Sequence, residues 1–450
     1  MVKKNVSIKK SRILMGFLAL AVALVAGVWH FSPWFRTWAL EKVDQARGAA
    51  IHYELLDQVE ARNIRQVMTA DPSRSRVIQW QSDYPVKELV LEYRKAGESS
   101  LTAASVTEEK FRDGGKDTWI YTARLEQLEP GQSYEYRIRA EKKATEWMPL
   151  QAFAGNTFKA LIFPDSQSAD YSVWKATAQP AWQRNPDASF FVNMGDLVDN
   201  GEDSSQWNAW FGVVEPMAEK IPVAPLMGNH ETYDLNWKVR MPEGYLHRFA
   251  LPDNGREKYR NQFYSFTVGD VHFVVLNTQN EELKEWEPEL ARDQEAWFQE
   301  DMARNRGKWN IVLMHKDPLQ YAFDPATRPG RDRAEGFSPE GREWMPLFDR
   351  YGVDLVLSAH LHTYRNRGKI YDFQRADRGP SYVITGVAGD VRYPSLWKRH
   401  ALDVTVAPQP ETDNYLVLEK QEDQLQIQCF LPDGTLVDTV TVRKSGEKAW

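Results

Sequence analysis

The sequence has a single cysteine, Cys429, among its 450 residues. One thiol cannot form a disulfide within the chain, nor can it build a zinc site from several cysteines. Cys429 lies in the alternating segment 425–430, which is typical of a strand, so we expect a packed side chain rather than a nucleophile.

Basic residues are not in excess either. Lys and Arg number 56 against 63 Asp and Glu, which gives a net charge of -7. Proteins that bind nucleic acid usually carry a basic face, so we expect no nucleic-acid binding, nucleotide substrates aside. With 42% hydrophobic and 26% charged residues, the composition predicts a globular chain of more than one domain.

Long apolar runs are scarce, and the longest lies at the N-terminus. Residues 13–35 contain no Asp, Glu, Lys or Arg and follow a basic segment, residues 3–12. About 20 apolar residues in a helix cross a bilayer, and the aromatic residues 29–38 are typical of a membrane interface. We expect residues 1–38 to form a single-pass signal-anchor. The N-terminus would be cytoplasmic and the catalytic domain periplasmic or extracellular.

The alternative is a cleaved signal peptide, which would make the protein secreted. The small residues Ala21 and Ala23 lie inside the apolar run, and aromatic rather than small polar residues follow Ala26. This pattern favours the anchor.

The remaining chain divides into four segments. Residues 39–63 mix charged and apolar residues at helical spacing and predict a helical linker. Residues 64–155 contain short β-branched and aromatic runs between turns, which predicts a β-sandwich. In residues 156–408 apolar runs alternate with helical segments, which predicts an α/β domain. Residues 409–450 predict a C-terminal β-hairpin packing on that domain.

Polar residues follow five apolar runs of the α/β segment. They are Asp165 and Gln167, then Asp196, then Asn229 and His230, then His315, and finally His360 and His362. Each alone would be read as a cap or a core residue. Because ligands collect at the carboxyl ends of strands in α/β sheets, we expect all five groups to converge. Carboxylate, amide and imidazole groups suit Mn, Fe or Zn, and paired ions clamp a phosphoryl group while a metal-bound hydroxide attacks it.

These groups resemble the motifs of the calcineurin-like metallophosphoesterases. The motifs read Asp165-Ser166-Gln167, Gly195-Asp196-Leu197-Val198-Asp199, Gly228-Asn229-His230-Glu231, Met314-His315 and Ala359-His360-Leu361-His362. Residues 66–80, 264–276 and 362–365 are similar to the purple acid phosphatase branch. The resemblance implies a four-layer sandwich of β-sheets flanked by helices, preceded by an all-β, fibronectin type III-like sandwich.

The resemblance also implies a role for each matching residue. Asp165 and His362 would bind a first divalent metal ion, Asp196 would bridge two ions, and Asn229, His315 and His360 would bind the second. His230 would donate a proton to the leaving oxygen. Glu231 and Asp234 are candidates for orienting that imidazole, with surface acids as the alternative, and Tyr364 and Arg365 are candidates for contacting substrate. For Arg365 the alternative is an ion pair with a carboxylate.

Two positions depart from the family pattern. Asp199 replaces the tyrosine that gives purple acid phosphatases their colour, so a stable ferric ion is not expected. Asp199 either ligates a metal or hydrogen-bonds a ligand. Gln167 stands where relatives have histidine, and an amide oxygen suits Zn²⁺ less well than imidazole does. We therefore expect the first site to prefer Mn²⁺ or Fe²⁺, or to bind its ion loosely.

The sequence thus predicts a membrane-anchored enzyme that hydrolyses phosphate mono- or diesters with two divalent metal ions and His230. Its partners would be a phosphoester substrate and, through the N-terminal helix, the lipid bilayer. The alternative, motivated by Gln167 and Asp199, is a degenerate metallophosphoesterase that binds a ligand or partner without turnover.

Overall fold

The computed structural model describes residues 25–444. About half of the predicted membrane span 13–35, residues 13–24, therefore lies outside the described residues. Across 25–444, no helix combines the length and the apolar character that crossing a bilayer requires. The predicted anchor segment also ends within a helix of the folded body, because α2 (Pro33–His52) begins with Pro33 after the N-cap Ser32.

The region after α2 is an all-β sandwich. Its strands are β1 (Arg62–Val67), β2 (Arg76–Ser82), β3 (Leu89–Lys95), β4 (Thr102–Ala104), β5 (Val106–Asp113), β6 (Lys116–Leu125), β7 (Ser133–Ala140), β8 (Lys143–Ala144) and β9 (Met148–Gln151). One layer contains β1, β2, β6 and β5, and the other contains β4, β3, β7 and β8, with β9 paired to β7. Trp80, Tyr121 and Tyr136 are fully buried between the layers. This confirms the predicted N-terminal sandwich.

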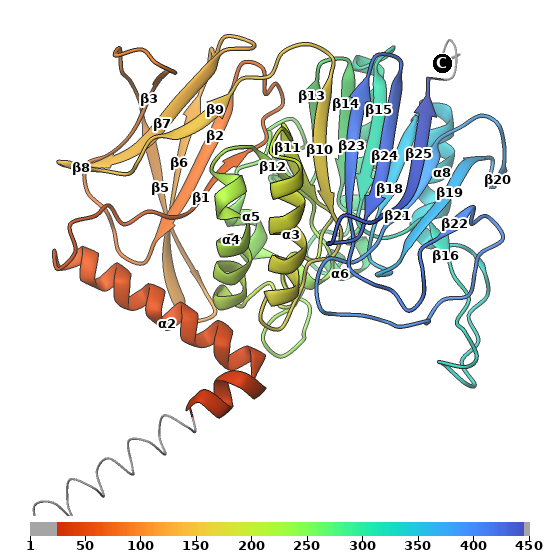
Figure 1. Cartoon of the computed structure of the whole chain (residues 1–450). Helices are drawn as coiled ribbons and strands as arrows, with labels where there is room; N and C mark the ends of the chain where they lie inside the picture. The colour runs from red at the N-terminus through yellow and green to blue at the C-terminus, as the bar shows by residue number, and fades with distance from the viewer. Residues whose placement is uncertain (1–24, 445–450) are drawn as a thin grey trace, which may run out of the picture.

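The first layer of this sandwich continues into the α/β region. A ten-stranded sheet has the order β25-β24-β23-β10-β11-β12-β1-β2-β6-β5. Its further strands are β10 (Phe158–Phe163), β11 (Phe190–Asn193), β12 (Val223–Pro225), β23 (Tyr415–Gln421), β24 (Gln424–Phe430) and β25 (Leu436–Arg443). The junction is a parallel pairing of Val67 in β1 with Val223 in β12. Figure 1 shows the orange N-terminal strands leading into the α/β sheets.

The C-terminal strands extend the same sheet. The predicted hairpin is β24 and β25, and β23 joins it edge to edge with β10 through antiparallel pairing. The hairpin therefore extends the ten-stranded sheet at one edge.

A second, eight-stranded sheet packs against the first. Its strands are β13 (Tyr264–Val268), β14 (Val271–Leu276), β15 (Trp309–Met314), β18 (Leu355–Ser358), β21 (Ser381–Thr385), β19 (Tyr364–Tyr371), β20 (Gln374–Arg375) and β22 (Thr405–Val406). Phe190 of the first sheet meets Phe266 and Phe273 of the second, with ring centroids 5.9 and 5.6 Å apart. Strands β14, β15, β18 and β21 are parallel, and the two-residue strands β16 (Leu319–Gln320) and β17 (Gly336–Phe337) form a separate pair.

Helices complete a four-layer sandwich, as the sequence predicts. The helices are α3 (Ser172–Arg184), α4 (Ser204–Ala218), α5 (Glu243–Arg248), α6 (Asn280–Leu283), α7 (Leu290–Arg304) and α8 (Pro339–Arg350), with short turns η1 (His230–Thr232) and η2 (Glu257–Tyr259). Trp174 of α3 packs on Phe163 of the first sheet. Phe298 of α7 packs on Trp344 of α8, and Asp301 of α7 bonds to His272 of the second sheet. Figure 1 shows α2 lying below the N-terminal strands, with its first residues nearest α3 and α4.

Candidate metal centre

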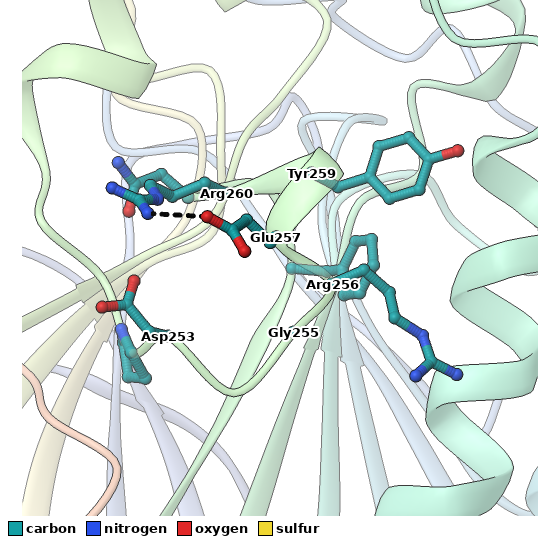
Figure 2. Close-up of a pocket in the computed structure, with 9 residues that line it drawn as sticks. Asp253, Gly255, Arg256, Glu257, Tyr259 and Arg260 are labelled. Atoms are coloured by element: carbon teal, nitrogen blue, oxygen red, sulfur yellow. Dashed lines mark ion pairs between the residues drawn. The ribbon is translucent and has the colours of Figure 1, made fainter.

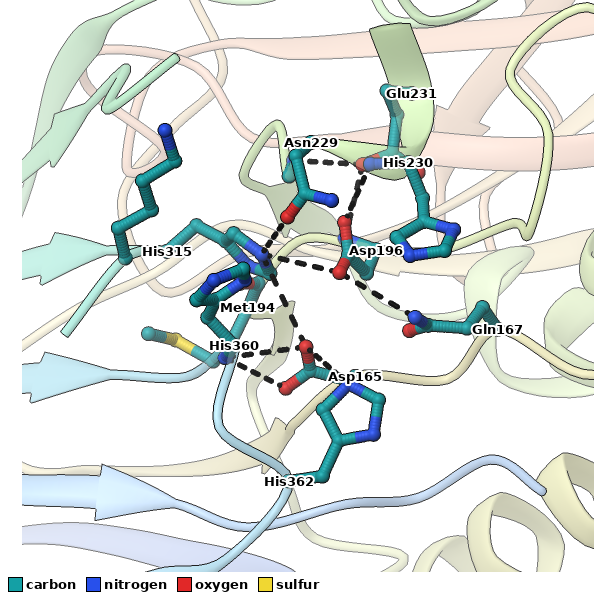
Figure 3. Close-up of polar contacts among 12 residues, drawn as sticks. Asp165, Gln167, Met194, Asp196, Asn229, His230, Glu231, His315, His360 and His362 are labelled. Atoms are coloured by element: carbon teal, nitrogen blue, oxygen red, sulfur yellow. Dashed lines mark hydrogen bonds and ion pairs between the residues drawn. The ribbon is translucent and has the colours of Figure 1, made fainter. Parts of the chain in front are cut away.

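The predicted ligands lie just beyond the carboxyl ends of strands from both sheets. Asp165 follows β10, Asp196 follows β11, His315 follows β15, and His360 follows β18. Two of these turns are abrupt, because Asp196 and His360 have φ of 50° and 71°, in the left-handed region. Figure 3 shows the side chains meeting at one point between the loops. The structure therefore brings the five sequence-distant groups together.

One ligand group is formed by Asp196, His315 and His360, whose ligand atoms all lie within 4.8 Å of one another. His315 Nδ1 donates a hydrogen bond to the Met194 carbonyl at 2.8 Å. Its Nε2 is therefore free for an ion, and lies 3.2 Å from Asp196 Oδ2 and 3.3 Å from Asn229 Oδ1. Burial, helped by His315, lowers the pKa of His360 well below its usual value. Its imidazole is then neutral, the form that binds metals.

A second ligand group is formed by Asp165, Asp196 and His362, also within 4.8 Å of one another. His362 Nδ1 donates to the Val391 carbonyl at 2.7 Å, which leaves Nε2 3.4 Å from Asp165 Oδ1. Gln167 reaches the same place, with Nε2 3.5 Å from Asp196 Oδ2. Its Oε1 is buried without a hydrogen-bond partner among the described residues. Turning the amide over would present this oxygen to an ion.

Asp196 belongs to both groups, which is the position of a bridging ligand. Burial by itself would raise the pKa of the Asp196 carboxyl, but the His315 and His230 imidazoles lower it overall. Two buried carboxylates, imidazole nitrogens and an amide oxygen without a hydrogen-bond partner face a common point, and that donor set fits divalent cations. The residues present thus fit two metal ions. Asp165, Gln167 and His362 would hold the first, and Asn229, His315 and His360 would hold the second.

Glu231, a sequence candidate for orienting the His230 imidazole or for a surface acid, is buried and binds backbone N–H groups. Its buried carboxylate accepts hydrogen bonds from the backbone N–H groups of Asp196, Leu197, Val198 and Gly228, at 2.9, 2.8, 3.2 and 2.7 Å. Burial, together with the charge of Asp196, raises the pKa of Glu231 to about 7. Glu231 therefore ties the turn after β11 to the turn after β12. Gly228 is required there, because a Cβ would lie 2.1 Å from Asp196 Oδ1.

Asp199 is the residue that orients His230. His230 Nδ1 donates to the Asp199 carbonyl at 2.8 Å and lies 3.3 Å from Asp199 Oδ1. Burial alone would lower the pKa of His230, but the charge of Asp196 and the contacts with Asp199 raise it to about 10. Asp199 belongs to neither ligand group. This arrangement holds the His230 ring with Nε2 available for proton transfer.

Three further sequence candidates lie elsewhere. Asp234 caps its own turn, accepting from the backbone N–H of Asn236 at 2.7 Å. Tyr364 donates to Asp438 at 2.9 Å, and buried Arg365 pairs with Asp403 at 2.9 Å. Arg365 thus follows its structural alternative, and both Tyr364 and Arg365 bind carboxylates other than the predicted ligands.

Sequence reasoning missed the aromatic side chains around the site. Tyr233 and Trp237 lie against the His230 ring, and Tyr393 lies against His362 with ring centroids 4.9 Å apart. The signal available was the spacing of Tyr233 and Trp237 just after His230.

A separate pocket of about 180 Å³ lies in the 252–263 segment (Figure 2). None of the predicted ligands line it. Its cations are paired, Arg260 with Glu257 at 3.5 Å and Arg256 with Glu300 at 2.7 Å. It therefore adds nothing to the metal centre.

Comparison with known families agrees with this geometry. Residues 158–364 match the calcineurin-like phosphoesterase family, and residues 61–154 match the purple acid phosphatase N-terminal domain.

Individual relatives are more distant. Purple acid phosphatase 15 of Arabidopsis thaliana is 27% identical over 214 residues, 46% of this chain and 36% of that protein. Acid phosphatase type 7 of Homo sapiens is 26% identical over 315 residues, 62% of this chain and 67% of that protein. The purple acid phosphatase PPD1 of yellow lupin (Lupinus luteus) superposes with a TM-score of 0.69 at 17% identity. That superposition covers 86% of this chain and 75% of the lupin chain, and it shows a shared fold.

The two matched regions follow one another along the chain, and the ligand groups lie in the second of them. The chain belongs to the calcineurin-like metallophosphoesterases, with the N-terminal domain of the purple acid phosphatases.

Proposed function

We propose that the protein is a metal-dependent hydrolase of phosphate mono- or diesters, with His230 as the proton donor to the leaving group. The observation that carries this proposal is the pair of buried ligand groups that share Asp196 next to the oriented His230–Asp199 pair. When bound, two divalent ions (Mn, Fe or Zn) supply positive charge for the phosphate and an activated water.

The chain's own residues account for the rest of the reaction. The Asp199 carbonyl fixes the proton on His230 Nδ1, so the other ring nitrogen faces the site. An imidazolium in this position can give its Nε2 proton to a departing oxygen, which makes that oxygen a better leaving group. The buried Glu231 carboxylate keeps the Asp196 and Gly228 turns at a fixed separation, and thereby keeps His230 beside the ligands.

The same geometry weighs against a degenerate binding protein. That alternative rested on Gln167 and Asp199. Asp199 orients His230, a proton donor that a purely binding protein would not need. Gln167 lies in the ligand group and presents an amide to it.

We also propose that the apolar segment 13–35 anchors the protein in a membrane, with the catalytic domain on the periplasmic or extracellular side. Its support is the basic segment that precedes an uncharged stretch of spanning length. Mass spectrometry of the native protein tests this. A mature N-terminus near Gly27 would show cleavage and contradict the anchor.

Hydrolysis of a chromogenic phosphoester by the purified protein with Mn²⁺ tests the function. Asp196→Ala should abolish turnover, and His230→Ala should lower kcat by ~10²–10⁴, the usual share of general acid catalysis. Asp253→Asn, in the pocket of Figure 2, is the matched control and should behave as wild type. Full activity in both site variants would overturn the mechanism, and a metal content of zero per chain would favour the binding protein.

A further inference from the structure

The turn that follows His230 carries an exposed tryptophan, Trp237. Tyr233 and Val239 form an antiparallel bridge across this turn, and the Trp237 N–H donates to the Asp234 carbonyl at 3.0 Å. The Asp234 carboxylate accepts from Lys238 N–H at 2.8 Å. The turn is therefore internally hydrogen-bonded, and the Trp237 side chain is still 53% exposed.

Trp237 also adopts an unfavourable backbone conformation. Its φ is 62°, in the left-handed region that glycine and asparagine tolerate and that a bulky residue rarely enters. A ring that is half exposed gains little burial to offset that strain. Strained residues of this kind concentrate at functional sites, where the surroundings hold them in place.

The ring lies next to the proton donor. The Trp237 and His230 ring centroids are 5.9 Å apart and perpendicular, and those of Tyr233 and His230 are 5.4 Å apart. Tyr233 and Trp237 are themselves 5.9 Å apart. Since the leaving oxygen must come to His230 to receive its proton, the group attached to that oxygen passes beside these two rings.

The turn is held from several directions. Arg240 pairs with Asp113 of β5 at 2.7 Å, and the Leu235 N–H donates to Glu202 at 2.9 Å. Asn200 donates to the Asp234 carbonyl at 2.9 Å. The N-terminal sandwich therefore supports the turn through β5, and Trp237 is presented on a pre-organised surface rather than on a free loop.

We propose that Trp237, with Tyr233, forms an aromatic subsite for the leaving group, so that the preferred substrates are phosphoesters of flat, aromatic alcohols. The inference rests on the proposed function, because it places the leaving group by the role of His230. An aromatic face stacks on a planar ring and offers little to a small aliphatic alcohol. Stacking on an exposed ring corresponds to about a 10-fold preference.

The test compares one aryl and one aliphatic substrate, 4-nitrophenyl phosphate and glycerol phosphate, and takes the ratio of variant to wild-type kcat/KM for each. Trp237→Asn should lower the aryl ratio about 10-fold and leave the aliphatic ratio within about 2-fold. Its melting temperature should stay the same or rise, because asparagine tolerates the positive φ. Trp237→Phe should keep most of the aryl preference. Leu235→Ala, which removes an equally exposed side chain from the same turn, should change neither ratio.

Equal losses for the two substrates would overturn the subsite and assign Trp237 to positioning His230. Unchanged ratios for both substrates would overturn it as well. Binding of phenylphosphonate and methylphosphonate to the Mn²⁺-loaded protein, measured by calorimetry, gives a readout that needs no turnover. Selective loss of phenylphosphonate affinity in Trp237→Asn supports the subsite even if catalysis is absent, and no selective loss contradicts it. Failure of the wild type to hydrolyse both monoesters and the diester bis(4-nitrophenyl) phosphate would instead contradict the proposed function.

Discussion

The two halves of the metal centre share Asp196 but are held by different parts of the molecule. In the second-metal half, His315 is fixed by the Met194 carbonyl just after β11, and Glu231 clamps the turns that carry Asp196 and Asn229. All of these groups stand at the ends of central strands. The second-metal half is therefore positioned directly by the strands of the two sheets.

The first-metal half depends on longer loops. Past Asp165, the loop that carries Gln167 is tied to the 386–393 loop, because the Ala169 N–H donates to Asp390 at 3.0 Å. On its other side it is tied to α2. Thr37 donates to the Ala169 carbonyl at 3.0 Å, and Arg36 pairs with Asp170 at 2.7 Å. We therefore expect the two halves to hold their ions with different strength, and the first ion to be the easier one to lose.

The largest expected effect comes from removing one histidine from each half. His315→Ala and His362→Ala should each lower kcat at least ~100-fold, since even outer residues of metal sites matter by about 10–100-fold. Excess Mn²⁺ should partly rescue His362→Ala and fail to rescue His315→Ala. Activity during Mn²⁺ titration, with ions per chain counted for both variants, checks this. Equal rescue of the two variants would show that both halves hold their ions equally well.

Glu231→Gln tests the clamp of the second half. The amide keeps the shape but turns a donor towards backbone N–H groups that now lack a carboxylate acceptor. A buried donor without a partner costs ~1–3 kcal/mol, so the free energy of unfolding should fall by that amount in denaturant titrations. Glu281→Gln, at an exposed carboxylate of α6, is the matched control and should stay within ~0.5 kcal/mol of wild type. Wild-type stability in Glu231→Gln would show that the clamp contributes little.

Gln167→His should reduce the difference in metal retention between the first-metal half and the second-metal half. An imidazole in place of the amide gives the first ion a better nitrogen donor, and we expect about 10-fold tighter retention, within the range over which metal-site residues act. Ions per chain after dialysis against a graded chelator measure it. Gln167→Ala should shift retention the other way, and the same retention in all three proteins would exclude Gln167 as a ligand.

Arg36→Ala should have the smallest effect. The Arg36–Asp170 pair is partly exposed, and such pairs contribute ~1 kcal/mol or less. We expect a few-fold faster loss of the first ion and an unchanged second ion, followed by metal release into a chromogenic chelator. Arg47→Ala, on the same helix but bonded to Gln58 at the surface, is the control. An equal effect on the two ions would show that α2 does not act on one half alone.

The sequence could indicate which residues gather at the candidate site, because that depends on residue type and on strand position. Asp165, Asp196, His315 and His360 each follow an apolar run, and the ends of such runs converge in an α/β sheet. What it could not give was the direction of side chains within the site. The Glu231 carboxylate accepts hydrogen bonds from backbone N–H groups, and Asp199 rather than Asp234 accepts from His230. Both contacts depend on how two turns that are distant in sequence face one another.

The pairing of strands that are distant in sequence could not be predicted from the sequence either. The pattern of residues 64–155 predicts a sandwich, and that of residues 156–408 predicts an α/β unit. Neither pattern indicates that β1 would lie beside β12, because that contact joins residues far apart in the chain. About half of the N-terminal span, residues 13–24, lies outside the described residues, so the anchor stays a prediction.

The ten-stranded sheet, which both domains share, limits how the chain can be truncated. The unpaired edge of a sheet is a template on which other chains aggregate. The outer strands of the ten-stranded sheet are β25 and β5. If residues 61–154 were removed, β12 would lose β1 and become a new edge of this kind. The N-terminal sandwich thus covers the edge of β12. We therefore expect the α/β domain to aggregate when it is produced without the sandwich, whatever substrate the centre acts on.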